Sequence, residues 1–164
     1  MEARADVTPP APDAVSAIEA VVQAGATETH YHRAGSGPAV LLLFPGGADD
    51  PPAARLFARL ARRFRVIAPR PPASVRAAAR FVDGDPAPLS DWLRDLIDGL
   101  GLVRPGLVVH DTFGPAALAF SRTDPDRAGA LVALSRDASA PGGAAMPIDE
   151  MIRALCAETA VAPS

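Results

Sequence analysis

The sequence has 164 residues, of which 49% are hydrophobic and 21% are charged; these proportions indicate one globular domain and exclude a mostly disordered chain. The net charge of −3, without a basic stripe along the chain, argues against nucleic acid or an anionic membrane as a partner. The single cysteine, Cys156, excludes an internal disulfide framework and a cysteine metal cluster, and no apolar run approaches the ~20 residues of a membrane helix. We therefore expect a cytoplasmic protein.

Three regions of different composition divide the chain. Residues 1–12 have the prolines and charges of a flexible tail, residues 13–137 carry the patterns of a folded core, and residues 138–164 are predicted to form a loop and a C-terminal helix. At the start of the core, the Ala/Val/Ile-rich stretch 13–24 predicts a short helix. Alternation over residues 27–33 then predicts a strand, which turn residues follow.

Apolar runs without alternation mark the strands of the central sheet. Such runs are typical of strands buried on both faces, as in parallel sheets. Apolar residues at helical spacing between the runs predict crossover helices, the clearest of which has Ser90 as its N-cap and ends at Gly101. The alternation of strands and helices predicts an α/β fold with a three-layer, doubly wound and mostly parallel sheet. The predicted strands are residues 39–44, 65–69, 107–110 and 130–135, and the predicted helices are residues 51–63, 90–100 and 114–122.

Candidate functional residues follow these strands. Ligands bind at the carboxyl ends of the strands in open parallel sheets, so the loops after the four strands are expected to share one rim. Asp111 on that rim has two interpretations, a reactive carboxylate or the N-cap of the helix that starts near Thr112. Gly46-Gly47 belongs to no phosphate-binding motif, so no nucleotide cofactor is predicted. The rim residues are Pro45-Gly46-Gly47, Arg70, Asp111-Thr112 and Arg136-Asp137.

The order and wording of several segments resemble the α/β-hydrolase superfamily. Residues 29–43 are similar to the opening hairpin and first long core strand of the family, and residues 64–69 to the strand that follows. Residues 125–134 are similar to a helix exit and the next strand. Between them, residues 108–115 (Val-Val-His-Asp-Thr-Phe-Gly-Pro) resemble the nucleophile elbow of the branch that includes haloalkane dehalogenases and epoxide hydrolases, in which the nucleophile is Asp.

This resemblance implies roles for four residues. Asp111 would be the nucleophile, held in a strained backbone conformation at a sharp turn, and would form an ester with a small organic substrate. The oxyanion donors would be the backbone N–H of Thr112 and one from the loop after Leu43, at Phe44. Asp137, just after the fourth strand, stands where some dehalogenases carry their third acidic member. The resemblance implies no cofactor and no metal.

The sequence also departs from the family pattern. Val109 and Phe113 replace the small residues that usually flank the nucleophile, and Arg70 replaces a usual Asp. The family takes its catalytic His from a late loop, after a cap and two further core strands, whereas the histidines here are His30, His32 and His110.

The sequence therefore predicts a shortened or truncated hydrolase of this fold, without the late core strands and the cap. The alternative is a non-catalytic remnant or binding module of the same fold. A third interpretation is a homo-oligomer in which a partner covers the sheet edge that the late strands would cover.

Overall fold

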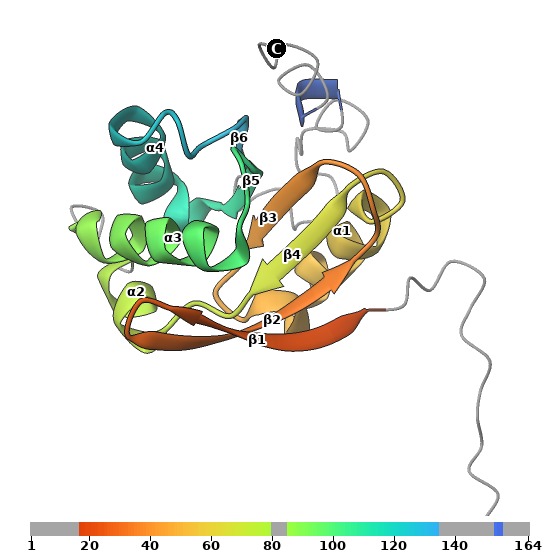
Figure 1. Ribbon diagram of the computed structural model, residues 1–164, viewed down its shortest axis with the longest axis horizontal. Coiled ribbons are helices and arrows are strands. Elements are labelled where there is room, and N and C mark those ends of the chain that lie inside the picture. Colours follow the sequence, from red (N-terminus) through yellow and green to blue (C-terminus); the bar gives the residue numbers. More distant parts are fainter. Residues whose placement is uncertain (1–16, 80–84, 135–152, 156–164) are drawn as a thin grey trace, which may run out of the picture.

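The computed structural model describes residues 17–79, 85–134 and 153–155, and Figure 1 shows how their helices and strands are arranged. All four predicted core strands and the three predicted helices are present. In chain order the elements are β1 (Ile18–Ala24), β2 (Thr27–Ala34), β3 (Ala39–Leu43), the 3₁₀ turn η1 (Gly47–Asp49), α1 (Pro51–Leu60), β4 (Arg65–Pro69), α2 (Ala73–Ala79), α3 (Ala87–Leu100), β5 (Gly106–His110), the 3₁₀ turn η2 (Asp111–Phe113), α4 (Gly114–Thr123) and β6 (Leu131–Leu134).

The strands form one sheet in the order β1-β2-β4-β3-β5-β6. β3 pairs parallel with β4 and with β5, and β5 pairs parallel with β6. The β1–β2 hairpin extends this parallel body, because β2 pairs antiparallel with β4. The predicted α/β fold with a mostly parallel sheet is confirmed.

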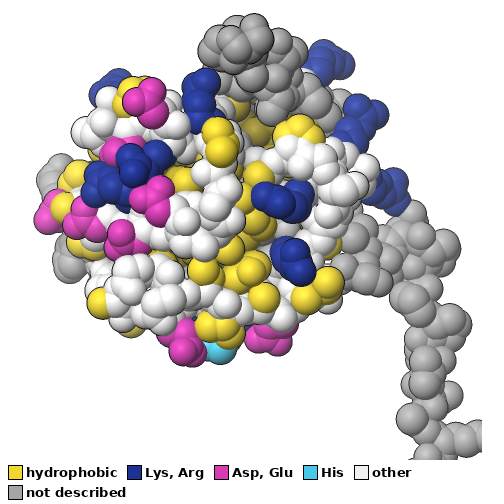
Figure 2. Space-filling view, in the orientation of Figure 1, with side chains coloured by type: hydrophobic (Ala, Val, Ile, Leu, Met, Phe, Trp, Pro, Cys, Tyr) yellow, Lys and Arg dark blue, Asp and Glu magenta, His cyan; other side chains and the backbone are white. Residues whose placement is uncertain are grey.

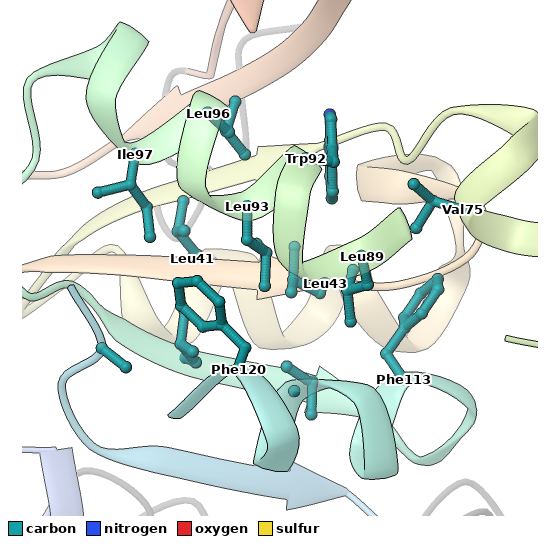
Figure 3. Close-up of a cluster of buried hydrophobic side chains, with 14 of the residues drawn as sticks. Leu41, Leu43, Val75, Leu89, Trp92, Leu93, Leu96, Ile97, Phe113 and Phe120 are labelled. Atoms are coloured by element: carbon teal, nitrogen blue, oxygen red, sulfur yellow. The ribbon is translucent and has the colours of Figure 1, made fainter. Parts of the chain in front are cut away.

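Alternate residues of the buried strands supply two hydrophobic clusters, one on each face of the sheet. Leu41 and Leu43 of β3 face a cluster with α2, α3 and α4, whereas Val40 and Leu42 face a cluster with α1. Figure 3 shows the first cluster, in which Trp92, Leu93 and Phe120 lie over the sheet. The fold therefore has the three predicted layers.

The connections change direction at β3 and β5, which are neighbours in the sheet. From β3 the chain crosses over α1 to β4, and from β5 it crosses over α4 to β6 on the other side. Crossovers of the same hand that run in opposite directions place their helices on opposite faces, as the two clusters show. The carboxyl ends of β3 and β5 thus form the topological switch point, where open α/β sheets bind ligands.

Two local predictions are wrong. The described part of residues 13–24 is not a helix but strand β1, which pairs along its whole length with β2 after the turn at Gly25, whose φ is +59°. Ser90 is not an N-cap, because α3 begins three residues earlier, where Pro88 in the first turn suits a helix start. Gly101 does end α3 in the predicted left-handed conformation.

Charged side chains are distributed unevenly over the surface. Residues 51–66 contain five arginines and no carboxylate, and all five are exposed on or just after α1. Figure 2 shows acidic side chains over α3, α4 and the β1–β2 hairpin, with basic side chains among them over α3 and α4, and basic side chains without acidic neighbours on the side where Figure 1 shows α1. The absence of a nucleic-acid or membrane partner stays a prediction.

Candidate active site

The candidate site lies at the switch point, between the loop after β3 and the turn after β5. The ring of Phe44, directly after β3, packs against the ring of His110, the last residue of β5, with centroids 5.4 Å apart and planes at 58°. Phe44 is buried, at 3% exposure. The structure thus brings together Phe44, Asp111 and Thr112, the predicted site residues that it describes.

The turn after β5 is capped by His110. The His110 backbone is extended, with φ −63° and ψ 149°, and its ring nitrogen Nδ1 accepts a hydrogen bond from the backbone N–H of Thr112. Asp111 is the first residue of η2, so the interpretation of Asp111 as the N-cap is wrong. His110, and not Asp111, is therefore the N-cap of this turn.

The backbone at Asp111 is not strained. Among the described residues other than glycine, only Arg104 has a positive φ, at 45°. Val109 and Phe113 are each fully buried, where a sharp elbow needs small side chains, and the chain passes into α4 through the 3₁₀ turn instead. The strained conformation that the family resemblance implied at Asp111 is therefore absent.

The Asp111 carboxylate is partly shielded from solvent. Oδ1 is shielded from solvent and lies 2.9 Å from Nδ1 of His110. The whole side chain is nevertheless 32% exposed, so part of it faces solvent.

The His110 ring joins three polar groups. Its Nδ1 lies 2.9 Å from the Thr112 hydroxyl, 2.9 Å from Asp111 Oδ1 and 3.2 Å from the Thr112 nitrogen. With its proton on Nε2, the ring accepts the Thr112 N–H. With a proton on Nδ1, it donates toward an oxygen instead and no longer accepts from Thr112. The position of one proton therefore decides whether the predicted oxyanion donor at Thr112 is already engaged.

The loop after β3 also uses its backbone donors internally. Gly47 N–H donates to the Phe44 carbonyl at 3.0 Å, and Gly46 N–H donates to Oδ2 of Asp50 at 2.9 Å. Arg70, directly after β4, forms an ion pair with Asp49 of this loop. Sequence reasoning missed both aspartates, although an Asp before Pro-Pro at a helix start is a recognisable signal for a loop-closing acceptor.

Two of the predicted rim residues, Asp137 and Arg136, lie outside the described residues. Within the described ranges, no group of three or more His, Cys, Asp or Glu side chains is arranged to hold a metal ion. None of the described helices combines the length and apolarity needed to cross a membrane.

Two solved structures with a similar fold are hydrolases by name. A serine hydrolase involved in carbazole degradation superposes with a TM-score of 0.60 at 26% identity, over 73% of this chain and 48% of that one. A Vigna radiata epoxide hydrolase mutant superposes with a TM-score of 0.59 at 25% identity, over 73% and 39%. The chain has the α/β-hydrolase fold.

The α/β-hydrolase fold is represented here in part, since the chain spans less than half of each of these structures. Among curated sequences, an uncharacterized protein of Mycobacterium bovis and one of Mycobacterium tuberculosis are each 32% identical over 105 residues. That match covers 64% of this chain but only 31% of either relative. No family model matches the sequence.

The two similar structures differ in what their names state, since one is a serine hydrolase and the other an epoxide hydrolase. This chain shares the fold with both structures, but the fold does not identify its nucleophile. The role of Asp111 therefore depends on the surroundings of Asp111 itself.

Proposed function

We propose that the chain carries the nucleophile site of a hydrolase for small organic electrophiles, with the Asp111 carboxylate as the nucleophile. One observation supports this most directly. Asp111 stands at the topological switch point of a hydrolase-type sheet, with Oδ1 shielded beside His110 and about a third of the side chain exposed, at 32%. A carboxylate at this position lies where open α/β sheets bind their ligands.

The chemistry is a two-step displacement. A carboxylate oxygen of Asp111 forms a bond to the electrophilic carbon while the carbon–halogen or epoxide carbon–oxygen bond breaks. A halide leaves the substrate, whereas the epoxide oxygen stays on it as an alkoxide that takes a proton from water. Water then adds to the Asp111 carbonyl carbon, which releases the alcohol, the carboxylate and one proton. The sequence has no histidine after His110 to act as the base for this second step. We therefore expect the ester to form and to persist.

A second candidate function is a binding module that keeps the fold without the chemistry. Two observations favour it, namely the relaxed backbone at Asp111 and the Thr112 N–H that is directed to His110. In this alternative the carboxylate helps to recognise a ligand and forms no bond to it. Turnover of a p-nitrophenyl ester that Asp111→Ala abolishes would rule this alternative out.

Mass spectrometry distinguishes the two functions. The protein is incubated with a neutral haloalkane and, separately, with a terminal epoxide, and the modified peptide is sequenced. The proposal expects one adduct on Asp111, absent from Asp111→Asn, which has nearly the same shape but no nucleophilic carboxylate. Asp126→Asn, at an exposed carboxylate after α4, should be alkylated like the wild type. A folded wild-type protein that stays unmodified by both reagents would refute the proposal.

A further inference from the structure

One ring nitrogen of His110 has three polar neighbours. Nδ1 lies 2.9 Å from Oδ1 of Asp111, 2.9 Å from the Thr112 hydroxyl and 3.2 Å from the Thr112 backbone nitrogen. A ring nitrogen holds either a proton or a lone pair, so it donates or it accepts, but it cannot do both at once. With an ionised Asp111, the three contacts therefore cannot all be hydrogen bonds at the same time.

The contact with Asp111 indicates where the proton of the ring lies. A distance of 2.9 Å between a nitrogen and an oxygen is that of a hydrogen bond. An ionised carboxylate only accepts, and so does Nδ1 when the proton is on Nε2, so the two atoms would repel each other at this distance. An imidazole is a stronger base than a carboxylate, so the proton of this contact belongs to the nitrogen.

Packing holds the ring for both positions of the proton. The buried ring of Phe44 lies against the His110 ring, with centroids 5.4 Å apart. The His110 backbone is held as well, because His110 is the last residue of β5 and pairs with Leu134 of β6. Nδ1 can thus change from an acceptor to a donor without a movement of the ring.

We propose that His110 is a positioning residue whose proton lies on Nδ1, where it holds Asp111 and releases Thr112. Nδ1–H donates to Oδ1 of Asp111, and this charge-assisted hydrogen bond fixes the carboxylate. The Thr112 N–H then faces a donor instead of an acceptor and becomes available to an oxyanion. This role in the reaction rests on the proposed function of Asp111, whereas the position of the proton does not depend on it.

A ¹⁵N NMR spectrum of the histidine side chains tests the position of the proton without any substrate. Protonated and unprotonated ring nitrogens have well-separated chemical shifts, and the His110 signals are assigned by their loss in His110→Asn. At neutral pH we expect Nδ1 of His110 to be protonated. A proton on Nε2 alone would overturn the proposal, whether or not Asp111 reacts with an electrophile.

Replacement of Asp111 shows whether the carboxylate holds that proton. In Asp111→Ala the acceptor is missing, so the proton should move to Nε2, and Nδ1 should accept the Thr112 N–H. Asp126→Ala, at an exposed carboxylate after α4, should leave the proton on Nδ1. The signals of His30 and His32, both on β2, report whether each variant is folded. A proton that stays on Nδ1 in a folded Asp111→Ala would contradict the proposal.

A chemical reaction tests the release of Thr112. On the ester that the proposed function forms at Asp111, the nitrogen of hydroxylamine adds to the carbonyl carbon, the ester carbon–oxygen bond breaks, and the alcohol departs with a proton. The tetrahedral intermediate carries an oxyanion, which the released Thr112 N–H stabilises. In His110→Asn, the Asn carbonyl oxygen accepts the Thr112 N–H as an N-cap and carries no proton that could release it. We expect hydroxylamine to cleave the ester at least about tenfold more slowly in this variant than in the wild type.

The outcomes separate the inference from the proposed function. His30→Asn, at an exposed histidine on β2, is the matched control and should react at the wild-type rate. Equal cleavage rates in His110→Asn and the wild type would refute the release of Thr112. Absence of any ester in the wild type would instead refute the proposed function, and the NMR spectrum would still decide the position of the His110 proton.

Discussion

The Trp92 indole illustrates how one polar atom is accommodated in the core. Its N–H donates to the Thr29 hydroxyl at 3.1 Å, and the two residues are only 5% and 1% exposed. The bond joins α3 to β2, two elements that are distant in sequence. A buried donor without an acceptor loses its hydration without compensation, so Thr29 is required wherever Trp92 is present.

Replacing Thr29 should therefore cost more than its small size suggests. Thr29→Val keeps the shape but removes the acceptor, and we expect a loss of about 1–3 kcal/mol in unfolding free energy. In a Trp92→Phe background the same replacement should cost less, because no N–H is left unsatisfied. Urea unfolding of both single variants and the double variant measures the coupling, with exposed Thr27→Val as the control. Additive losses would contradict the expectation.

At the scale of elements, ion pairs tie α3 to the exit of α4. Arg94 donates to both oxygens of Asp124, at 3.2 and 2.9 Å, and Arg127 donates to both oxygens of Asp98 at 3.2 Å. The Asp124 side chain is only 12% exposed. The hydrogen bond from Arg94 lowers the pKa of Asp124, with burial opposing it and the Thr123 hydroxyl adding to it.

This pKa shift gives the α3–α4 contact a pH dependence of known sign. A carboxyl whose pKa is lower in the folded state stabilises the fold above its ordinary pKa of 3.8, and that stability is lost as pH falls through the lower folded-state pKa. Asp124→Asn should cost about 1 kcal/mol at pH 7 and progressively less below about pH 4. Urea unfolding between these pH values measures the difference. A gap that stays constant, or an equal loss for exposed Asp126→Asn, would refute it.

Sequence patterns predicted the elements well where burial alone decides them. β3, β4 and β5 are continuous apolar runs and were predicted within a residue or so. β1 was missed because Ala, Val and Ile suit either a helix or a strand, and pairing with β2 decides between them. The helix or strand propensity of a short segment is small, and the backbone hydrogen bonds gained by pairing with β2 outweigh it.

The position of Phe44 and Asp111 in the fold can be predicted from the sequence, whereas their local geometry cannot. The strand order alone brings Phe44 and Asp111 to the same rim, and this follows from the alternation of strands and helices. The backbone at Asp111 depends on how Val109 and Phe113 pack, and the His110 cap depends on a side-chain orientation. Neither the Asp111 backbone conformation nor the His110 cap can be predicted from neighbouring residues in the sequence.

At the scale of the whole molecule, the turn between β2 and β3 holds the hairpin against the parallel body. Gly35 has φ +80°, and a Cβ there would lie 2.2 Å from the Phe64 carbonyl oxygen and 2.4 Å from that of Ala61. Both oxygens belong to the backbone and cannot move aside. The turn is thus closed onto the end of α1 by direct backbone contact.

Gly35→Ala should consequently destabilise the protein far more than Gly101→Ala. Both glycines have a positive φ, but a Cβ at Gly101 would meet nothing within 4 Å, so its replacement costs only about 1–2 kcal/mol for the conformation. Gly35→Ala adds the clash, and we expect at least twice that loss. Thermal unfolding of the two variants compares them directly. Similar melting temperatures would mean that the turn has room to shift.

The arginines on and just after α1 make the isoelectric point a poor guide to how the protein behaves at an interface. With a sequence pI of about 5.5, the chain as a whole migrates as an anion at neutral pH. A chromatography matrix, however, contacts one side of a molecule at a time. The electrostatic field of the matrix is screened beyond about 10 Å at 0.1 M salt, so the charges on the far side of the protein contribute little. We therefore expect the side that carries α1 to adhere to a sulfonate resin in spite of the acidic isoelectric point.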